Sequence, residues 1–350
     1  MHSTVINAVA PIRICDLGGW TDTWFADEGT IFNIGVYPYA EVQIHAVQRT
    51  NADQRRIVLN AENFGDRYEL GPGKIQYDRH PLLEACIDIM ELPEELSFEI
   101  NLYSEAPAGA STGTSAAVSV ALIGGLDLLT PGSLTPHEVA ALAHRVETEC
   151  LGLQCGIQDQ LCSAYGGLNF MEMFHYPKAS VSPVSLPNST WWELERRLVL
   201  VFLGNAHSSS AVHGQVIARL EKPGADKSML EEMRRLARKG KDALSAGDFE
   251  AFGQAMVANT EAQRALHPGL VSQDADRVIE IAREHGALGW KVNGAGGEGG
   301  SITVLCGPTN GAKRAFQRAL READAKYQVI PTYLSRQGLR RWIAGAPAGA

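Results

Sequence analysis

A glycine- and hydroxyl-rich segment at residues 105–129, EAPAGASTGTSAAVSVALIGGLDLL, could hold an anion. It leads from a strand-like run into a long apolar stretch typical of a buried helix, whose first amides lack internal partners and carry partial positive charge. Gly109 and Gly113 would let backbone N–H groups approach a ligand closely. The neighbouring hydroxyl side chains add donors or hard oxygen ligands: Ser111, Thr112, Thr114 and Ser115. These features favour a polyphosphate cradle, with an ordinary Gly/Ser turn as the simpler alternative.

The same segment also fits a different chemistry, because GASTG at 109–113 matches the G-x-S-x-G pattern with Ser111 as nucleophile. Candidate bases lie downstream: His207, His213, His267 and His285. A hydrolase elbow needs the serine at the tip of a strand that runs straight into a helix, whereas Pro107 and Ala108 loosen this junction. No HGGG-type oxyanion segment precedes it. A serine hydrolase is therefore the weaker hypothesis.

A second glycine-rich string, GAGGEG at 294–299, fits the dinucleotide pattern G-x-G-x-x-G. The strand-like SITVL follows it in place of a helix, and the acidic residue expected about 20 positions later is missing, so a dinucleotide site is not expected. The chain also lacks the G-x-x-x-x-G-K-[ST] pattern of P-loop kinases. Cys150, Cys155 and Cys162 cluster without the paired spacing of a zinc site, which favours small buried side chains over ligands.

Composition bounds the remaining possibilities. The chain has 350 residues, of which 45% are hydrophobic and 20% charged, so a globular protein of two lobes is expected. A formal charge of −9 argues against a broad electrostatic footprint for nucleic acid or anionic lipid. Six cysteines are too few for a disulfide scaffold, and neither a signal peptide nor a long apolar span is apparent. The sequence predicts a cytoplasmic protein without nucleic-acid or membrane partners.

Strands and helices are both needed to position these residues. Alternating or apolar runs predict strands at 40–49, 96–106, 168–173, 197–204, 289–293 and 301–306. Helical patterns cover 116–129, 136–151, 157–165, 227–246, 248–264 and 273–285, and Thr135 before Pro136 supplies an N-cap with a proline at the first helical position. The Pro- and Ser-rich segment 176–190 is the best linker candidate. Mixed elements without regular βαβ alternation indicate an α+β fold.

Four segments, in this order, resemble the GHMP kinase superfamily of galactokinase, homoserine kinase, mevalonate kinase and phosphomevalonate kinase. They are similar to its substrate-side motif, its phosphate loop, its segment with the catalytic aspartate and its glycine-rich hairpin: APIRICDLGGWTDT (10–23), PAGASTGTSAA (107–117), GIQDQLCSAYGG (156–167) and KVNGAGGEGGS (291–301). The resemblance implies an N-terminal lobe like ribosomal protein S5 domain 2 and a C-terminal ferredoxin-like lobe. We expect these lobes at residues 1–190 and 191–350.

The resemblance also implies the machinery of an ATP- and Mg²⁺-dependent kinase. Asp159 matches the aspartate that orients the acceptor hydroxyl and takes its proton, and Arg13 matches the arginine that pairs with it. Ser115 matches a hydroxyl ligand of Mg²⁺, a role that Thr114 could also take, and Glu147 matches the second metal ligand. The expected nucleotide-binding residues form the phosphate loop: Pro107, Ala108, Gly109, Ala110, Ser111, Thr112, Gly113, Thr114 and Ser115.

On the substrate side, the string GGWTDT is closer to fucokinase and heptose-phosphate kinase types than to the GEHTD of galactokinases. Asp22 matches an aspartate that binds sugar hydroxyls, and Trp20 could stack on a sugar face or belong to the core. The other expected substrate residues are Gly19, Gly167 and His207. The resemblance implies phosphorylation of a sugar at its anomeric hydroxyl and leaves fucose, galactose, arabinose, a uronic acid and heptose 7-phosphate open. A catalytically silent sugar and nucleotide sensor on the same fold is the alternative.

Three residues depart from the family pattern. Ser111 and Thr112 stand where the family usually has Gly-Leu, and Glu298 interrupts the glycine run of the third motif. Ser111 is expected to restrict the loop backbone, and Glu298 to add a negative charge near the phosphates. None of these three departures removes a catalytic group, so the expected reaction is the same.

Overall fold

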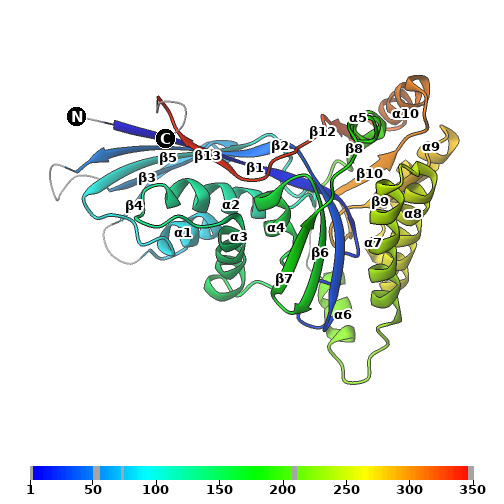
Figure 1. The fold of residues 1–350 in the computed structure, drawn as a ribbon, viewed down its shortest axis with the longest axis horizontal. Helices are drawn as coiled ribbons and strands as arrows, with labels where there is room; N and C mark the ends of the chain where they lie inside the picture. The colour runs from blue at the N-terminus through cyan, green and yellow to red at the C-terminus, as the bar shows by residue number, and fades with distance from the viewer. Residues whose placement is uncertain (1–2, 50–55, 72–74, 207–210, 346–350) are drawn as a thin grey trace.

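The computed structural model describes residues 3–49, 56–71, 75–206 and 211–345, and these residues form two sheets. The larger sheet has the strand order β13-β1-β2-β5-β3-β4, with β6 and β12 also paired to β2 and β7 paired to β6. The smaller sheet has the order β11-β8-β10-β9 and is antiparallel throughout. Figure 1 shows each sheet with its own set of helices. The predicted α+β fold is confirmed.

The strands of the larger sheet are β1 (Ser3–Leu17), β2 (Gly29–Gln48), β3 (Ile57–Ala61), β4 (Asp66–Leu70), β5 (Leu96–Ser104), β6 (Leu168–His175), β7 (Lys178–Pro183), β12 (Tyr333–Leu334) and β13 (Arg340–Ile343). Those of the smaller sheet are β8 (Leu198–Phe202), β9 (Gly289–Val292), β10 (Ser301–Leu305) and β11 (Gln328–Ile330). The helices are α1 (Pro81–Asp88), α2 (Thr114–Asp127), α3 (Pro136–Arg145), α4 (Gln158–Tyr165), α5 (Asn188–Arg197), α6 (Ala211–Leu220), α7 (Ser228–Ser245), α8 (Phe249–Leu266), α9 (Gln273–Glu284) and α10 (Asn310–Ala323).

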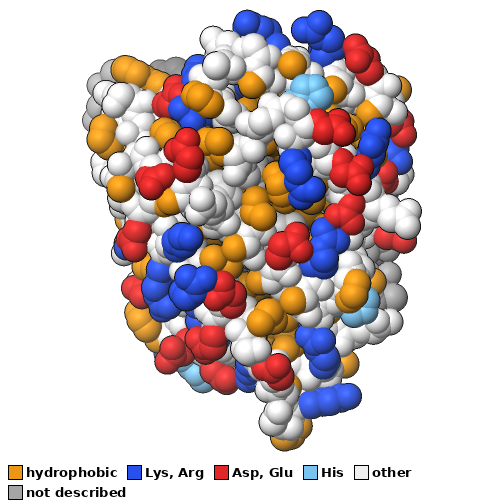
Figure 2. Space-filling model, turned by 90° about the vertical axis from the view of Figure 1, so that its right-hand side faces the viewer, with side chains coloured by type: hydrophobic (Ala, Val, Ile, Leu, Met, Phe, Trp, Pro, Cys, Tyr) orange, Lys and Arg blue, Asp and Glu red, His pale blue; other side chains and the backbone are white. Residues whose placement is uncertain are grey.

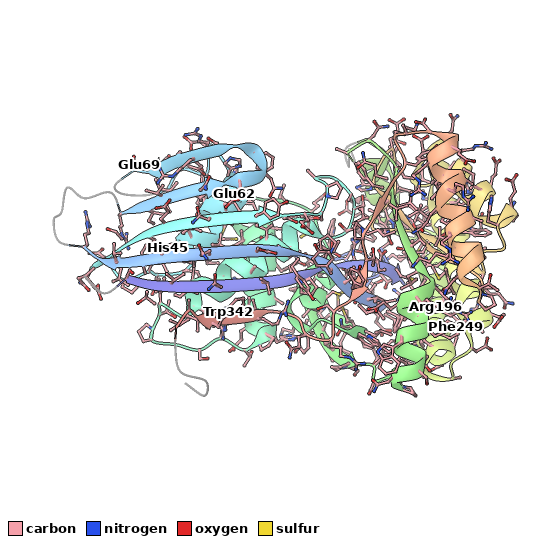
Figure 3. The ribbon with its side chains drawn as sticks, turned by 90° about the horizontal axis from the view of Figure 1, so that it is seen from above. His45, Glu62, Glu69, Arg196, Phe249 and Trp342 are labelled. Carbon is pink, nitrogen blue, oxygen red and sulfur yellow. The ribbon has the colours of Figure 1, made fainter. Side chains whose placement is uncertain are left out.

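Helices α1 to α4 cover one face of the larger sheet (Figure 1), and the main hydrophobic core lies between them. Helix α2 is buried on nearly every side, as its apolar sequence predicts, and Gly125 lets it approach the sheet side chains Ile44 and Ala8. The other face of the sheet exposes side chains such as His45 and Trp342 at one end (Figure 3), whereas α7 packs against β1 and β2 at the other end. The loop between β5 and α2 contacts the smaller sheet, because Ser301 of β10 donates to the Ala110 carbonyl.

The second layer consists of the smaller sheet and helices α7 to α10, at the right of Figure 1. Helix α7 packs against both β2 and α8, so it joins the two parts of the molecule. Figure 2 shows Lys and Arg side chains interspersed with Asp and Glu on this end of the molecule. None of the helices among the described residues is long and apolar enough to span a membrane.

Most predicted elements are present, and the local signals explain them. Thr135 caps α3 in a full capping box with Glu138, and Pro136 is the first helical residue, as expected. The predicted helix 136–151 is helical as far as Cys150, but its type changes, because the α-helix ends at Arg145 and a π-helical turn, Val146–Cys150, follows directly. A turn of this kind is rare and is frequent at functional sites.

Two further differences concern the second half of the chain. The segment 176–190 is not a free linker, because its residues Lys178–Pro183 form β7, which pairs with β6, and α5 begins at Asn188. Strands β12 and β13 return to the larger sheet, where they pair with β2 and β1. The C-terminal end of the chain therefore completes the first sheet, and the expected division at residue 190 stays a prediction.

Candidate active site

The end of β1 brings Arg13 into contact with two distant segments. Its Nε donates to Asp159 Oδ1 at 2.7 Å and its Nη2 to Asp159 Oδ2 at 3.0 Å, which makes a two-pronged ion pair. Its Nη1 donates to the Ser111 carbonyl, and its backbone N–H donates to the Thr112 carbonyl at 2.9 Å. Pairing of β1 with β2 shifts register on both sides of Arg13, a bulged geometry that re-aims side chains. Arg13 and Asp159 are therefore in direct contact, and their catalytic roles stay a prediction.

The loop before α2 has the backbone of an anion cradle. Gly109, Ser111 and Gly113 all have positive φ, at 73°, 56° and 68°, so left-handed residues alternate along the loop. Helix α2 begins at Thr114 without a side-chain cap, which leaves its first-turn amides available to a ligand. Successive amides in such a turn converge on one point and attract anions. Ser111 thus adopts the conformation for which the family pattern usually has glycine.

The glycine-rich string after β9 packs beside this loop. Strands β9 and β10 are antiparallel neighbours, so residues 293–300 form a hairpin connection, as expected, and not a strand-to-helix turn. Ser301 Oγ donates to the Ala110 carbonyl at 2.5 Å. A Cβ atom at Gly294 would lie 3.1 Å from Ser111 O and 3.2 Å from Arg13 Nη2. Three sequence motifs therefore converge around one arginine.

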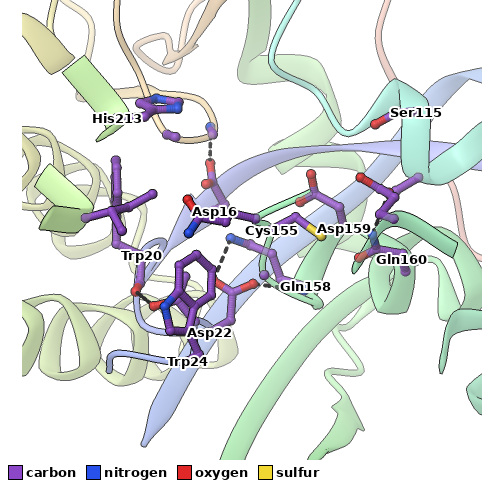
Figure 4. Close-up of a pocket in the computed structure, with 18 of the residues that line it drawn as sticks. Asp16, Trp20, Asp22, Trp24, Ser115, Cys155, Gln158, Asp159, Gln160 and His213 are labelled. Atoms are coloured by element: carbon purple, nitrogen blue, oxygen red, sulfur yellow. Dashed lines mark hydrogen bonds between the residues drawn. The ribbon is translucent and has the colours of Figure 1, made fainter. Parts of the chain in front are cut away.

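A cavity of about 260 Å³, the acceptor cavity, opens beside this cluster (Figure 4). Asp22 lies on its wall, where Oδ2 accepts from the Gln158 N–H at 3.0 Å and Oδ1 from Gln158 Nε2 at 3.4 Å. A Cβ atom at Gly156 would lie 2.0 Å from Asp22 Oδ2, so the glycine makes room for the carboxylate. Burial raises the pKa of Asp22 to about 6, although the Gln158 amide opposes the shift.

Aromatic rings form another part of the wall. Trp20 has a φ of 74°, an uncommon value for a large side chain, and its ring packs edge-on against His213 with centroids 5.3 Å apart. Trp24 donates from Nε1 to Glu221 Oε1 at 2.6 Å and packs against Phe25. The cavity thus joins apolar ring surface to carboxylates, the combination that binds sugars.

Glu147 and Ser115 lie at the other end of the acceptor cavity. The π-helical turn carries Glu147, which accepts a hydrogen bond from Gln160 Nε2 at 2.8 Å. Burial raises the pKa of Glu147 to about 7. Ser115 is exposed and lines both this cavity and a second one, whereas the Thr114 hydroxyl lies 3.2 Å from Thr112 Oγ1 and lines only the second. This placement favours Ser115 over Thr114 as a metal ligand.

One carboxylate and one hydroxyl suit Mg²⁺, which keeps several waters and prefers oxygen ligands. A cation beside Glu147 would also offset the cost of burying its charge. No group of three or more His, Cys, Asp or Glu side chains with metal-binding geometry occurs among the described residues. The cluster Cys150, Cys155 and Cys162 accordingly consists of free thiols in this structure.

Comparisons with known proteins agree with this geometry. Residues 82–167 match the family model of the GHMP kinases N terminal domain, and residues 241–326 match that of the GHMP kinases C terminal domain. A mevalonate kinase of Pyrococcus horikoshii is 31% identical over 97% of this chain and 93% of its own length. The chain belongs to the GHMP kinases. Members of this family are phosphotransferases, and ATP is their phosphate donor.

Two further relatives of this GHMP kinase have names that include a phosphorylated heptose. The D-glycero-alpha-D-manno-heptose 7-phosphate kinase of Campylobacter jejuni is 29% identical, with 96% of this chain and 98% of that protein covered. The crystal structure of a D-glycero-D-manno-heptose 1-phosphate kinase from Bacteriodes thetaiotaomicron superposes with a TM-score of 0.74 at 26% identity, over 96% and 98% of the two chains. These matches confirm the predicted two-lobed GHMP kinase fold.

The second cavity of this GHMP kinase, about 580 Å³, lies on the far side of the phosphate loop and was not predicted from the sequence. Its walls are mostly apolar, with Phe64, Leu83, Leu102, Tyr103 and Val118 among the lining residues, and Pro107 to Gly109 form its rim. No local sequence pattern marks it, because its walls come from β3, α1, β5 and α2 together.

The structure places the other predicted residues as follows. Gly19 lies beside Asp16, since a Cβ atom on it would be 2.9 Å from Asp16 Oδ2. Gly167 does not line the acceptor cavity, and its backbone pairs instead with Gly35 and Ser335. His207 lies outside the described residues. Glu298 is exposed and lines neither cavity, so the described geometry does not bring its charge to the loop.

The alternative nucleophile has no base in the described part of the structure. Ser111 Oγ is buried without a hydrogen-bond partner there. His267 Nδ1 accepts from the Gly269 N–H at 3.1 Å, His285 Nδ1 lies 2.8 Å from Ile281 O, and His213 Nε2 lies 3.3 Å from Gly296 O. A Ser–His arrangement at Ser111 is thus not formed by any described histidine.

Proposed function

We propose that this GHMP kinase transfers the γ-phosphoryl group of ATP to the anomeric hydroxyl of a sugar, which gives a sugar 1-phosphate. The observation that carries the proposal is the Arg13–Asp159 pair at the boundary of the acceptor cavity and the phosphate loop. The heptose kinase relatives and the Asp22 carboxylate in the cavity support a sugar as the acceptor. All six cysteines are free thiols, which suits the proposed cytoplasmic location.

In the proposed reaction Asp159 accepts the proton of the sugar hydroxyl while the hydroxyl oxygen bonds to the γ-phosphorus. The bond from this phosphorus to the β–γ bridging oxygen breaks, and ADP leaves. Arg13 fixes the orientation of both Asp159 oxygens. Its guanidinium also places a positive charge close to the negative charge that develops on the phosphoryl group. The amides of the phosphate loop supply further donors for the phosphates.

Ser115 and Glu147 would hold Mg²⁺, because both residues line the acceptor cavity and Ser115 also lines the second cavity. When bound, the ion would neutralise charge on the phosphates and align them. We place the nucleoside in the second cavity, where apolar walls from four elements adjoin the loop. The catalytic Asp159 then lies between donor and acceptor.

Mevalonate is the competing acceptor, because mevalonate kinases are among the relatives above 30% identity. The two carboxylates nearest the aromatic wall, Asp16 and Asp22, favour a polyhydroxy compound over a hydroxy acid, since like charges repel in a buried site. A silent sensor is the second alternative. A sensor has no need for an aspartate, an arginine and a metal-binding pair in one cluster, so the kinase is favoured.

The test is ADP release from Mg·ATP with a panel of neutral sugars, uronic acids, heptose 7-phosphate and mevalonate, run beside Asp159→Asn. We expect sugar-dependent turnover that falls by at least about a hundredfold in the variant, while binding of an ATP analogue is kept. Turnover with mevalonate alone would reject the sugar acceptor. Nucleotide binding without turnover on any acceptor would favour the sensor, and covalent labelling of Ser111 by a fluorophosphonate would revive the hydrolase.

A further inference from the structure

Asp16 is a fully buried residue on the wall of the acceptor cavity, and only one of its carboxylate oxygens is paired. Oδ1 accepts from the Gly294 N–H at 3.0 Å and lies 3.6 Å from Lys291 Nζ. Oδ2 has no hydrogen-bond partner among the described residues. Figure 4 shows Asp16 in the middle of the cavity lining, between Trp20 and Asp159. The carboxylate is therefore anchored through one oxygen, and its other oxygen is buried and unpaired among the described residues.

A buried lysine, Lys291, lies beside the paired oxygen of Asp16. Lys291 is almost fully buried, and it also donates to Gln263 Oε1 at 3.1 Å and to the Val292 carbonyl, so it is fixed behind Asp16. A buried carboxylate oxygen without a partner is costly and rare in folded proteins. Such an atom on a cavity wall is explained if a ligand supplies the missing donor.

Two neighbouring features fit the same ligand. Gly19 places no side chain against Oδ2, whereas a Cβ atom at this position would lie only 2.9 Å from it. Trp20 Nε1 is also buried without a partner among the described residues, and Trp20 lines the same cavity. A hydroxyl group can donate to a carboxylate and accept from an indole N–H, so a polyhydroxy compound would satisfy both atoms.

The charges around the cavity point the same way. Its described lining residues include four carboxylates, Asp16, Asp22, Glu147 and Asp159, and one guanidinium. That guanidinium, on Arg13, already donates to Asp159 and to the Ser111 carbonyl. Figure 4 shows Asp16 and Asp22 on the Trp20 side of the cavity and Ser115 on the opposite side. Glu147 accepts from Gln160, which Figure 4 shows on the Ser115 side, so Asp16 and Asp22 are the two carboxylates on the Trp20 side. An anionic acceptor would meet like charges there.

We propose that Asp16 is a second substrate-binding carboxylate beside Asp22, and that the acceptor is an uncharged sugar rather than a sugar acid or a phosphorylated sugar. This inference rests on the proposed sugar kinase activity and deepens it. It separates this chain from the relatives whose names include a heptose phosphate. Oδ2 of Asp16 accepts from one sugar hydroxyl, and the Asp22 carboxylate accepts from others.

The first experiment compares matched acceptors with the wild-type protein: D-galactose with D-galacturonate, D-glucose with D-glucuronate, and L-fucose and L-arabinose with heptose 7-phosphate. We expect kcat/KM for neutral sugars to exceed that for their anionic counterparts by at least about a hundredfold. A preference for the acids or the phosphate would overturn the inference and leave the kinase proposal intact. Absence of turnover with every acceptor would reject both.

The second experiment changes Asp16 itself. Asp16→Asn keeps an oxygen for the Gly294 N–H but replaces Oδ2 by a donor, so KM for the neutral sugar should rise at least about tenfold and the neutral-to-anionic preference should fall by a similar factor. Binding of an ATP analogue should stay within about twofold. Gly19→Ala covers Asp16 Oδ2 with a methyl group and keeps the charge of the site. It should raise KM for the neutral sugar and leave the preference for neutral over anionic acceptors unchanged.

Asp127→Asn is the matched control, since Asp127 is also a buried carboxylate but accepts from the Leu134 N–H and Arg341, away from the cavity. It should lower the melting temperature and leave the sugar KM unchanged. An unchanged sugar KM and charge preference in Asp16→Asn would show that Asp16 has a structural role only. If that variant does not fold, Gly19→Ala and the wild-type panel still decide.

Discussion

Gly113 and Asp159 lie so close that a Cβ atom at position 113 would be 3.0 Å from Asp159 Oδ2. Gly113 is the N-cap residue of α2 and directly precedes its first residue, Thr114. The end of the phosphate loop therefore lies beside the proposed catalytic carboxylate. On its other side Asp159 is held by Arg13 through two hydrogen bonds. The loop and the catalytic group therefore fix each other's position, and this geometry leads to the first prediction.

Gly113→Ala should impair chemistry by displacing Asp159. The added methyl group needs about a few tenths of an ångström of movement, and small errors of this kind in catalytic geometry are costly. We expect kcat to fall at least about a hundredfold, with the fold kept. Gly65→Ala is the control, because Gly65 has a similar φ of 62° but nothing within 4 Å of an added Cβ. Equal kcat values for the two variants would contradict the prediction.

Gly156→Ala tests the position of Asp22. A Cβ atom at Gly156 would lie 2.0 Å from Asp22 Oδ2, which forces the carboxylate away from the Gln158 amide. The sugar KM should rise at least about tenfold while the affinity for an ATP analogue is kept. Gly71→Ala provides the comparison, since an added Cβ atom there meets nothing within 4 Å. A loss of ATP affinity equal to that of the sugar would mean that Gly156 supports the whole site.

The sequence predicted what local patterns determine. Thr135 and Pro136 mark the start of α3, and the antiparallel pair around the glycine-rich hairpin follows from two apolar runs. Asp16 could not be singled out, because its role depends on Gly294, 278 positions away. The Pro- and Ser-rich sequence of β7 predicts a linker because it lacks strand propensity, and the strand forms through its pairing with β6.

The same reasoning applies to the site. The resemblance supplied Arg13, Asp159, Ser115 and Glu147, and the structure brings these four side chains to one cavity. It also supplied Gly167, whose left-handed backbone serves contacts with Gly35 and Ser335 instead. The second cavity needs side chains from several elements, so no spacing within one segment could reveal it.

Ser111→Gly should stabilise the protein relative to Ser111→Ala. Ser111 has a φ of 56°, a left-handed conformation that costs residues with a Cβ about 1–2 kcal/mol, partly offset by the greater freedom of glycine in the unfolded chain. Both variants remove the unpaired hydroxyl, so their difference isolates the backbone term. We expect about 1 kcal/mol more unfolding free energy for the glycine variant in urea titrations. Equal stabilities would show that the loop relaxes in the alanine variant.

Asp22→Asn should make the protein more stable above pH 6, even though it weakens sugar binding. Burial raises the pKa of Asp22 from 3.8 to about 6, so the folded state binds this proton more tightly than the unfolded chain does. Stability from this group is therefore lost as pH rises from about 4 to 6, and the cost is complete above that range. The variant lacks this cost, which is on the order of 3 kcal/mol for a shift of this size.

The measurement is the unfolding free energy of wild type and Asp22→Asn between pH 4 and pH 8, without ligands. The unfolding free energy of the variant should rise relative to that of the wild type from about pH 4 to pH 6, and the difference should then stay constant up to pH 8. Taking the difference between the two proteins removes the titration of the groups that they share. Asp127→Asn again serves as a control, since it replaces a buried carboxylate that accepts from Arg341 and should be destabilising near neutral pH. A constant difference across the range would show that the Gln158 amide and local solvent already compensate the Asp22 charge.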